Sequence, residues 1–221
     1  MSPASVGIFG ATGPAGSGLA ARLASVGIDV VIGSRDLGRA EAVCQAIRDR
    51  WPDMDLPLQG AVNVDAAKAE VVVIATPWDA AASTAASVAE HLDGKVVISM
   101  ANALAKVGNE FDPLVPPRGS VAAHVQAEIP KACVAAAFHH LPARELANLD
   151  HSLEADVLVC SDHPNATAAA MALAEKMPGL RALDAWSLAN ATAIEALTAV
   201  LLQLNVRYKT RAGIRITGVG A

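Results

Sequence analysis

Short apolar runs alternate with longer alanine-rich stretches along the first two thirds of the chain. The short runs are rich in valine and isoleucine, and we predict strands at Val6–Phe9, Asp29–Ile32, Leu58–Val62, Val71–Ala75, Val96–Ser99 and Val134–Phe138. The stretches between them have the length of helices, which we predict at Pro14–Ser25, Leu37–Arg50, Pro77–His91 and Gly119–Glu128. Strands and helices that alternate in this way form a parallel sheet with helices on both faces. The pattern therefore predicts an α/β fold with a doubly wound parallel sheet of the Rossmann type.

The pattern changes after His140. From there the chain carries more charged and turn residues, with one brief apolar run at Val157–Cys160. A long helix is predicted from about Ser187 to Tyr208, because apolar residues recur along it at helical spacing. We predict a boundary near residue 141, with residues 1–141 forming the sheet domain and residues 142–221 a smaller C-terminal α/β part. No Gly/Ser-rich linker separates the two, which indicates that the second part packs closely on the first.

The acidic balance of the chain limits its partners. Lys and Arg number 17 against 22 Asp and Glu, which gives a formal net charge of −5. Proteins that bind nucleic acid or membrane surfaces normally carry a broad basic excess, so we predict neither partner. Apolar runs such as Leu197–Leu202 are too short to span a bilayer. Cys44, Cys133 and Cys160 lie far apart without CxxC spacing, so we expect no disulfide framework, no structural zinc and a cytoplasmic location.

A glycine-rich turn, GATGPAG, follows the first predicted strand and precedes the first predicted helix. This arrangement binds a dinucleotide pyrophosphate on backbone N–H groups at the positive end of the helix. Against the pattern G-x-G-x-x-G, Ala11 replaces the first glycine, Gly13 would admit the phosphates and Gly16 would allow close packing of helix on strand. A tight turn without a ligand is the less favoured alternative. We predict cofactor contacts from the whole turn: Ala11, Thr12, Gly13, Pro14, Ala15 and Gly16.

The second predicted strand ends in VVIGSRD, which bears on the choice of cofactor. NAD-binding sheets carry an acidic residue at this strand end to bind the ribose 2′-hydroxyl, but here that place is Gly33. The hydroxyl of Ser34 and the guanidinium of Arg35 suit a 2′-phosphate instead, with Arg39 one helical turn further on. We therefore predict NADP(H), and we expect Ser34 or Asp36 to cap the following helix as well.

Two common acid/base arrangements of reductases are missing from the chain. The only tyrosine, Tyr208, is followed four residues later by Ala212, so a Tyr-x-x-x-Lys pair is excluded. Lys176 has Leu180 four residues on, so the Lys and Asn of β-hydroxyacid dehydrogenases are missing too. The sequence supplies no proton donor of either kind.

Several longer motifs resemble the NADPH-dependent reductases of coenzyme F420, a deazaflavin. The resemblance covers nearly the whole chain and includes the glycine turn and the segments VVIGSR, IATPW, FHHLPARELANLD, DVLVCSD, GLRALDA, SLANATAIEALTAVLLQLN and YKTRAGIRITG. It implies hydride transfer between NADP(H) and coenzyme F420. Direct transfer between two rings would account for the missing acid/base pair, since the protein then has only to align the rings and exclude water.

The resemblance also assigns residues to the site. It implies that His139 lies beside the nicotinamide and the deazaflavin, that Leu141 supports the ring, and that Thr198 forms a hydrogen bond near the reaction centre. Asn102 would bind the nicotinamide end. The cofactor ribose would be bordered by Thr76, Pro77 and Trp78, for which a strand stop with a buried indole is an equal alternative. The His139–His140 pair has no carboxylate or cysteine at ligand spacing, so we predict no metal site.

Four positions depart from the family pattern and bear on the deazaflavin. The resemblance implies that Trp186, Ala189, Thr192 and Ala196 lie near it, and archaeal members carry arginine and serine where this chain has Thr192 and Ala196.

The C-terminal segment and the long helix suggest two further roles. Two explanations stay open for the basic residues near the C-terminus. They form a solvated basic terminus, or they contact the phosphate and glutamate tail of coenzyme F420. The residues are Arg207, Lys209, Arg211 and Arg215. The long helix favours a homodimer or higher homo-oligomer, as in the family. Residues 1–141 would then bind NADP, and residues 142–221 would serve substrate binding and oligomerisation. An NADPH reductase of another small acceptor and a non-catalytic nucleotide sensor stay open as alternatives.

Overall fold

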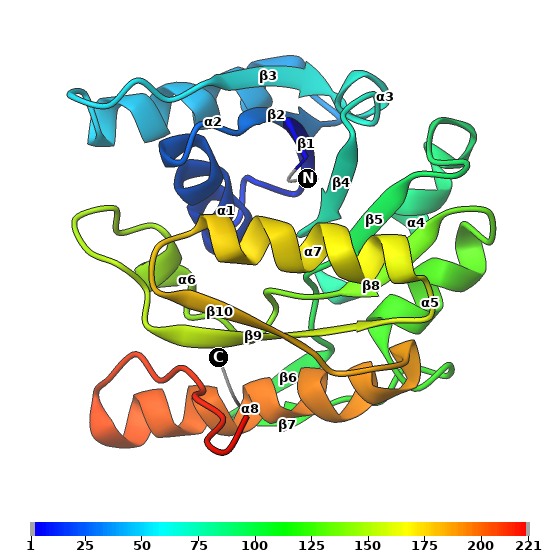
Figure 1. Cartoon of the computed structure of the whole chain (residues 1–221), viewed down its shortest axis with the longest axis vertical. Helices are drawn as coiled ribbons and strands as arrows, with labels where there is room; N and C mark the ends of the chain where they lie inside the picture. Colours follow the sequence, from blue (N-terminus) through cyan, green and yellow to red (C-terminus); the bar gives the residue numbers. More distant parts are fainter. Residues whose placement is uncertain (1–2, 220–221) are drawn as a thin grey trace.

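Eight strands form one central sheet in the computed structural model, which describes residues 3–219 (Figure 1). Its order is β10-β9-β8-β5-β4-β1-β2-β3. The strands of the N-terminal part are β1 (Ser5–Phe9), β2 (Asp29–Ser34), β3 (Leu58–Val62), β4 (Val71–Ile74), β5 (Val96–Ser99) and β8 (Cys133–Ala136). All six run parallel, with β1 between β2 and β4. The chain thus reverses its winding beside β1, where ligands bind in such sheets.

The last part of the chain extends this sheet with two more strands. β9 (Ala155–Ser161) pairs antiparallel with β8, and β10 (Leu180–Asp184) pairs parallel with β9. The sheet is therefore mostly parallel, which confirms the predicted fold class except for this reversal. The division into two domains near residue 141 stays a prediction.

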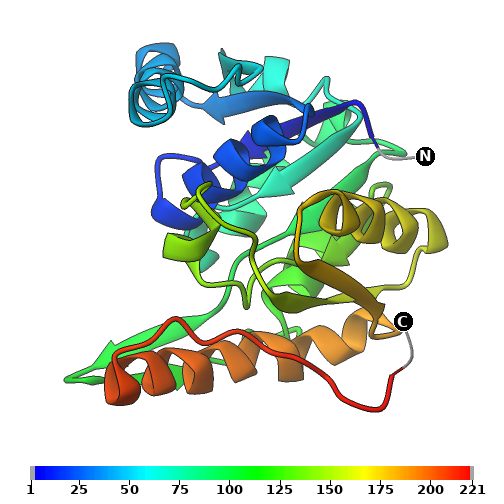
Figure 2. The ribbon, with the colours of Figure 1, turned by 60° about the vertical axis from the view of Figure 1, so that its left-hand side comes forward.

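Helices cover both faces of the sheet, as predicted (Figures 1 and 2). One buried cluster joins the sheet to α1 (Pro14–Ser25), α2 (Leu37–Arg50) and α7 (Pro164–Lys176). A second cluster joins the other face to α3 (Asn63–Ala66), α4 (Trp78–Ala86) and α5 (Val121–Glu128). Strand β4 is buried at every position because both of its faces are covered.

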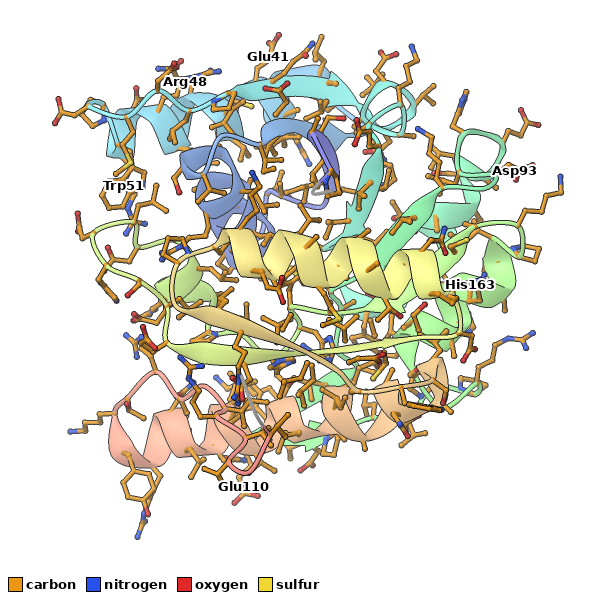
Figure 3. The ribbon with its side chains drawn as sticks, in the orientation of Figure 1. Glu41, Arg48, Trp51, Asp93, Glu110 and His163 are labelled. Carbon is orange, nitrogen blue, oxygen red and sulfur yellow. The ribbon has the colours of Figure 1, made fainter. Side chains whose placement is uncertain are left out.

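Charged side chains lie on the outer faces of these helices. Glu41 points outward from α2, Arg48 of the same helix donates a hydrogen bond to the carbonyl of Leu58 in β3, and Asp93 lies at the surface in the turn before β5 (Figure 3). Asp36 caps α2, with its carboxylate accepting a hydrogen bond from the backbone N–H of Arg39 at 2.9 Å. Asp36 is thus the capping residue, one of the two that the sequence suggested.

Most predicted elements are confirmed, and the differences lie at their ends and in the last third of the chain. The predicted helix Pro77–His91 is α4 followed by a separate 3-10 turn, η1 (Ala89–His91), and the helix expected from Gly119 begins at Val121. The strand expected to reach Phe138 ends at Ala136. Elements that the sequence did not predict are α3, β10, α7, the turn α6 (Ala143–Leu146), and the hairpin β6 (Leu104–Val107) and β7 (Glu110–Pro113).

The long C-terminal helix α8 (Ala191–Tyr208), preceded by η2 (Leu188–Asn190), confirms the predicted helix from about Ser187. It projects past the sheet together with the β6–β7 hairpin, and the C-terminal segment turns back along it (Figure 2). By length and composition alone, the segment Leu188–Tyr208 is apolar enough to cross a membrane, with a mean hydropathy of 1.2. In this fold, however, Glu195 and Thr198 of the same segment are buried against the rest of the protein.

Candidate active site

A cavity of about 870 Å³ opens at the carboxyl edge of the sheet. The residues that directly follow five neighbouring strands all line it: Gly10, Arg35, Asn63, Ala75 and Met100. Ligands of open α/β sheets bind at this edge, where the strand order reverses. The cavity therefore lies where the fold class predicts a dinucleotide.

The glycine turn forms the middle of this cavity. Gly10 has a left-handed backbone with φ of 82°, and a Cβ there would lie 2.6 Å from the backbone nitrogen of Thr76. A Cβ at Gly16 would lie 2.8 Å from Cα of Ala11, whereas Gly13 has only one atom within 4 Å, the Gly10 carbonyl at 3.6 Å. Gly10 and Gly16 thus permit close backbone packing, and Gly13 leaves open space at the start of α1.

The first turn of α1 faces this space without a capping side chain. Its N–H groups have no partners within the helix, and the helix dipole favours an anion there. Thr12, Gly13, Pro14 and Ala15 line the cavity, as the sequence predicted, while Ala11 is fully buried and, like Gly16, lies behind the wall. Cofactor contact by any of these six residues stays a prediction.

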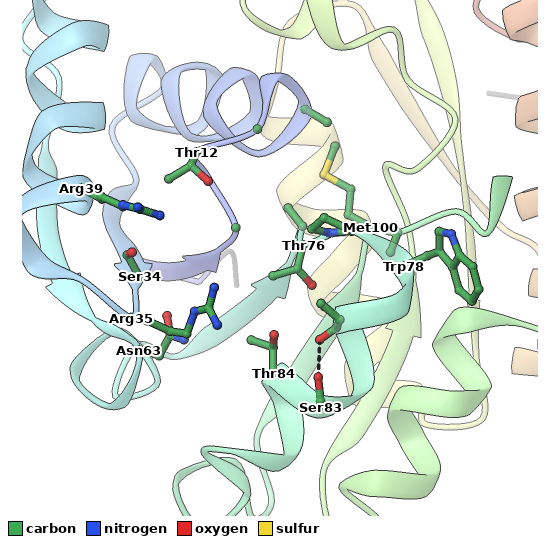
Figure 4. Close-up of a pocket in the computed structure, with 18 of the residues that line it drawn as sticks. Thr12, Ser34, Arg35, Arg39, Asn63, Thr76, Trp78, Ser83, Thr84 and Met100 are labelled. Atoms are coloured by element: carbon green, nitrogen blue, oxygen red, sulfur yellow. Dashed lines mark hydrogen bonds between the residues drawn. The ribbon is translucent and has the colours of Figure 1, made fainter. Parts of the chain in front are cut away.

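One end of the cavity carries the predicted polar and basic residues. Ser34, Arg35 and Arg39 all line it and approach one another there (Figure 4). The hydroxyl of Ser34 accepts a hydrogen bond from the backbone N–H of Asp36 at 3.2 Å, which fixes the turn after β2. The two guanidinium groups form no ion pair within the described residues 3–219, so both are available to an anion.

The other end of the cavity is built around Asn102. Its side-chain Nδ2 donates a hydrogen bond to the carbonyl of His139 at 2.7 Å, and its Oδ1 accepts one from the hydroxyl of Thr198 at 3.2 Å. Thr198 also lies 3.5 Å from the same carbonyl. The segment after β5, the segment after β8 and the helix α8 therefore meet here, although Asn102 and Thr198 are 96 residues apart in sequence. This network fixes which way the Asn102 amide points.

His139 lies behind this wall, buried with 4% of its surface exposed. Neither ring nitrogen has a hydrogen-bond partner within residues 3–219. Burial, with a smaller contribution from His140, lowers the pKa of His139 to about 3. The imidazole is therefore neutral at physiological pH. It can form an uncharged part of a ring-binding site but supplies no cationic acid.

His140 is held separately. Its Nε2 lies 3.0 Å from the carbonyl oxygen of Asp156, and its ring meets that of His139 edge-on with the centroids 5.0 Å apart. Burial lowers the pKa of His140 to about 4. No group of three or more His, Cys, Asp or Glu side chains suited to a metal occurs in the described part of the chain.

The backbone beside His139 is strained. Phe138 is fully buried and has a φ of 65°, a left-handed conformation that costs a bulky residue about 1–3 kcal/mol. The turn is closed by a hydrogen bond from the N–H of Leu141 to the carbonyl of Phe138 at 3.1 Å. This turn ends the strand earlier than the sequence predicted, and such strain tends to occur at functional sites.

The segment after β4 contributes the floor of the cavity. Thr76, Pro77 and Trp78 all line it, and the Thr76 hydroxyl is buried without a hydrogen-bond partner in the described chain. Trp78 is 37% exposed, so the alternative of a buried indole is not borne out. Leu141 is buried and does not line the cavity.

Sequence reasoning missed several lining residues. Gly10 opens the glycine turn ahead of the positions that the dinucleotide pattern specifies, and Asn63 follows the third strand without belonging to any motif. Hydroxyl residues at the end of α4 and directly after it line the same cavity, namely Ser83, Thr84 and Ser87. Ser83 and Thr84 precede Ser87 by four and three residues, a spacing typical of one helix face, and this is the signal that the sequence offers.

The basic C-terminal segment is partly neutralised. Arg215 forms ion pairs with Asp156 and Glu154, and Arg181 binds the Asp156 carboxylate through two nitrogens. Hydrogen bonding to Arg181 is the main cause that lowers the pKa of Asp156 to about 2. Arg215 therefore holds the C-terminal segment on the sheet, which argues against its binding a coenzyme tail.

Trp186 lies away from the cavity. Its carbonyl accepts a hydrogen bond from the N–H of Ser161 at 2.9 Å, beyond the antiparallel end of β9. Trp186 is not among the residues that line the cavity. The side chain is 78% exposed.

Comparisons with known proteins match this geometry. Residues 5–103 match the family model of coenzyme F420-dependent NADP oxidoreductases. The F420-dependent NADP reductase of Methanothermobacter marburgensis is 37% identical, over 97% of this chain and 98% of the relative. The corresponding enzyme of Methanocaldococcus jannaschii is 36% identical over the same shares of both chains. A candidate F420-dependent NADP reductase from Arthrobacter sp. FB24 has the same fold, with a TM-score of 0.80, 24% identity, and coverage of 97% of this chain and 99% of that one.

Proposed function

The chain belongs to the family of F420-dependent NADP reductases, and we propose that it transfers hydride between NADP(H) and the deazaflavin coenzyme F420 at the cavity described above. The observation that carries this proposal is the continuity of the cavity. It runs from Arg35, past the open turn at Gly13, to Asn102. A nicotinamide dinucleotide needs a phosphate-binding helix end between an adenosine site and a nicotinamide site, and this cavity offers the three in that order.

We assign the binding residues from this order. Ser34, Arg35 and Arg39 would hold the 2′-phosphate by charge-assisted hydrogen bonds. The N-terminus of α1 and Thr12 would hold the pyrophosphate. The unpartnered Thr76 hydroxyl and the neighbouring Pro77 and Trp78 would border the ribose. The open space at Gly13 and the unpartnered hydroxyl are features that such a ligand would fill.

The protein contributes to this reaction mainly by orienting the two coenzymes and excluding water. When bound, the nicotinamide supplies or receives hydride at C4 and the deazaflavin at C5. The chain contributes orientation, since Thr198 and the His139 carbonyl fix the Asn102 amide toward the nicotinamide end. His139 contributes an uncharged, buried wall that keeps water out and donates no proton at neutral pH.

The test is to mix the protein with NADPH and oxidised coenzyme F420 and to follow the visible absorbance of the deazaflavin. We expect bleaching with the wild-type protein. His139→Ala should slow the bleaching, while NADPH binding measured by calorimetry stays within about threefold, because His139 is not at the phosphate sites. Absence of bleaching at any pH, with NADPH still bound, would favour a reductase of another small acceptor.

We also propose that two copies associate through α8 and the β6–β7 hairpin. These elements expose large apolar side chains: Val107, Val200, Val206 and Tyr208 are each at least 53% exposed. Glu110 lies on the same hairpin below α8 (Figure 3). Apolar patches of this kind mark association surfaces.

The unpaired thiols Cys44, Cys133 and Cys160 support a reducing, cytoplasmic location.

A further inference from the structure

Asn63 lies beside the residues assigned to the 2′-phosphate. Strands β2 and β3 pair in parallel with Ser34 opposite Val62, so the next residue on each strand, Arg35 and Asn63, emerge side by side at the carboxyl edge. Both line the cavity, and their side chains are adjacent in Figure 4. No motif contains Asn63, and its position follows only from the strand register.

Asn63 also packs against Gly33, the position at which NAD-binding sheets carry an acidic residue. A Cβ at Gly33 would lie 2.7 Å from Cδ1 of Phe9 and 3.0 Å from Oδ1 of Asn63. It would also lie 3.0 Å from Cβ of Ala66. Phe9 and Ala66 are fully buried, so they have little room to move. The site therefore has no space for the acidic side chain that would bind the ribose 2′-hydroxyl of NAD(H).

The two ends of the Asn63 amide are in different surroundings. Oδ1 is buried beside Gly33 and has no hydrogen-bond partner in the described residues. Nδ2 also donates no hydrogen bond within residues 3–219, but unlike Oδ1 it is not fully buried. The side chain is thus positioned by packing, and its N–H donors remain available on the side of the cavity where Arg35 lies.

We propose that Asn63 is a specificity-determining residue for NADP(H) over NAD(H). This rests on the proposed function. The Asn63 amide donates a hydrogen bond to the 2′-phosphate alongside Ser34 and Arg35. With Phe9 and Ala66, its carbonyl end also closes the space at Gly33 to an acidic side chain. Asn63 thereby favours NADP(H), and it also excludes the acidic side chain that would bind the ribose of NAD(H).

The first experiment measures NADPH and NADH binding to Asn63→Asp by calorimetry, with thermal melting as a check of folding. The substitution keeps the shape of the side chain but replaces the donor by a negative charge. We expect NADPH affinity to fall roughly ten- to a hundredfold and NADH affinity to change less than about threefold. Asn63→Ala should weaken NADPH alone, by a smaller factor. Equal losses for both cofactors, or an unchanged NADPH affinity, would overturn the proposal.

Asp65→Ala is the matched control, since Asp65 is exposed on the same short helix and its one ion pair within residues 3–219 is with the exposed Lys68. It should leave both affinities unchanged. If wild-type protein binds no NADPH, the proposed function itself fails. If the wild type binds NADPH and Asn63→Asp does so equally well, only the assignment of Asn63 fails.

A separate variant, Gly33→Asp, tests whether Asn63 helps to close the space at Gly33 to an acidic side chain. We expect it to lower the melting temperature and to give no gain in NADH affinity, because the new side chain meets Phe9, Asn63 and Ala66. Tighter NADH binding at an unchanged melting temperature would show that the space is available, and would overturn this half of the proposal.

Discussion

At the scale of single residues, Arg35 provides the clearest test of the cofactor assignment. It lines the cavity directly after β2 and forms no ion pair within the described residues. Arg35→Ala should weaken NADPH binding by about 1.5–3 kcal/mol, the value of a hydrogen bond to a charged group, and should hardly change NADH binding. Calorimetry with both nucleotides measures this. Arg144→Ala, an exposed arginine outside the cavity, is the control. Equal losses for NADPH and NADH would remove Arg35 from the phosphate site.

The residues that could be predicted from sequence are those that belong to a local pattern. Ser34 and Arg35 follow a recognisable strand, and the glycine turn precedes a recognisable helix. Asn63 could not be predicted because its role depends on which strand lies beside β2, and the sequence leaves that pairing open. His139 was assigned by resemblance alone. Its burial and its lowered pKa depend on packing that no sequence pattern reveals.

At the scale of elements, Glu195 joins α8 to α5. Its carboxylate accepts hydrogen bonds from the backbone N–H groups of Val121 at 2.8 Å and Ala122 at 3.2 Å, the first turn of α5. Burial nevertheless raises the pKa of Glu195 from 4.5 to about 7. Thr198 lies one turn further along the same helix, so this contact also helps to place the hydroxyl that orients Asn102.

The raised pKa predicts a pH dependence of stability. The folded protein holds the proton of Glu195 more tightly than the unfolded chain does, so stability falls as pH rises between about 4.5 and 7 and the loss is complete above that window. Glu195→Gln should lack this effect. The difference in unfolding free energy between variant and wild type should change by roughly 2–3 kcal/mol from pH 5 to pH 8 in urea unfolding. His139 and His140 are present in both proteins, so their contributions to the pH dependence cancel in this difference. Parallel pH profiles would contradict this role of Glu195.

Among the elements, the alternating first part of the chain was predictable and the last third was not. Helix α7 is rich in alanine but follows only a short apolar run, and β10 reads Leu-Arg-Ala-Leu-Asp, which alternates too briefly to be decisive. The β6–β7 hairpin is polar and largely exposed, so it lacks the hydrophobic pattern of a strand pair. The antiparallel pairing of β9 with β8 depends on a long connection, which sequence periodicity does not describe.

At the scale of the whole molecule, the proposed dimer places α8 at the subunit interface. Val200→Glu introduces a charge on the exposed side of α8, where Val200 is 53% exposed, so the fold of a single chain should tolerate it. We expect light scattering to give twice the chain mass for the wild type and the single-chain mass for the variant. Met54→Glu, at a position 39% exposed in the loop after α2, should leave the mass unchanged. A wild-type protein with the mass of one chain would contradict the dimer.

The central claim, direct hydride transfer at this cavity, is tested by following the transferred hydrogen itself. The measurement uses NADPH deuterated at both C4 positions, oxidised coenzyme F420 and ordinary water, with mass spectrometry of the reduced deazaflavin. Because the transfer is ring to ring, we predict one deuterium in each reduced deazaflavin, at C5. A reduced deazaflavin without deuterium, formed while NADPH is oxidised, would contradict this account.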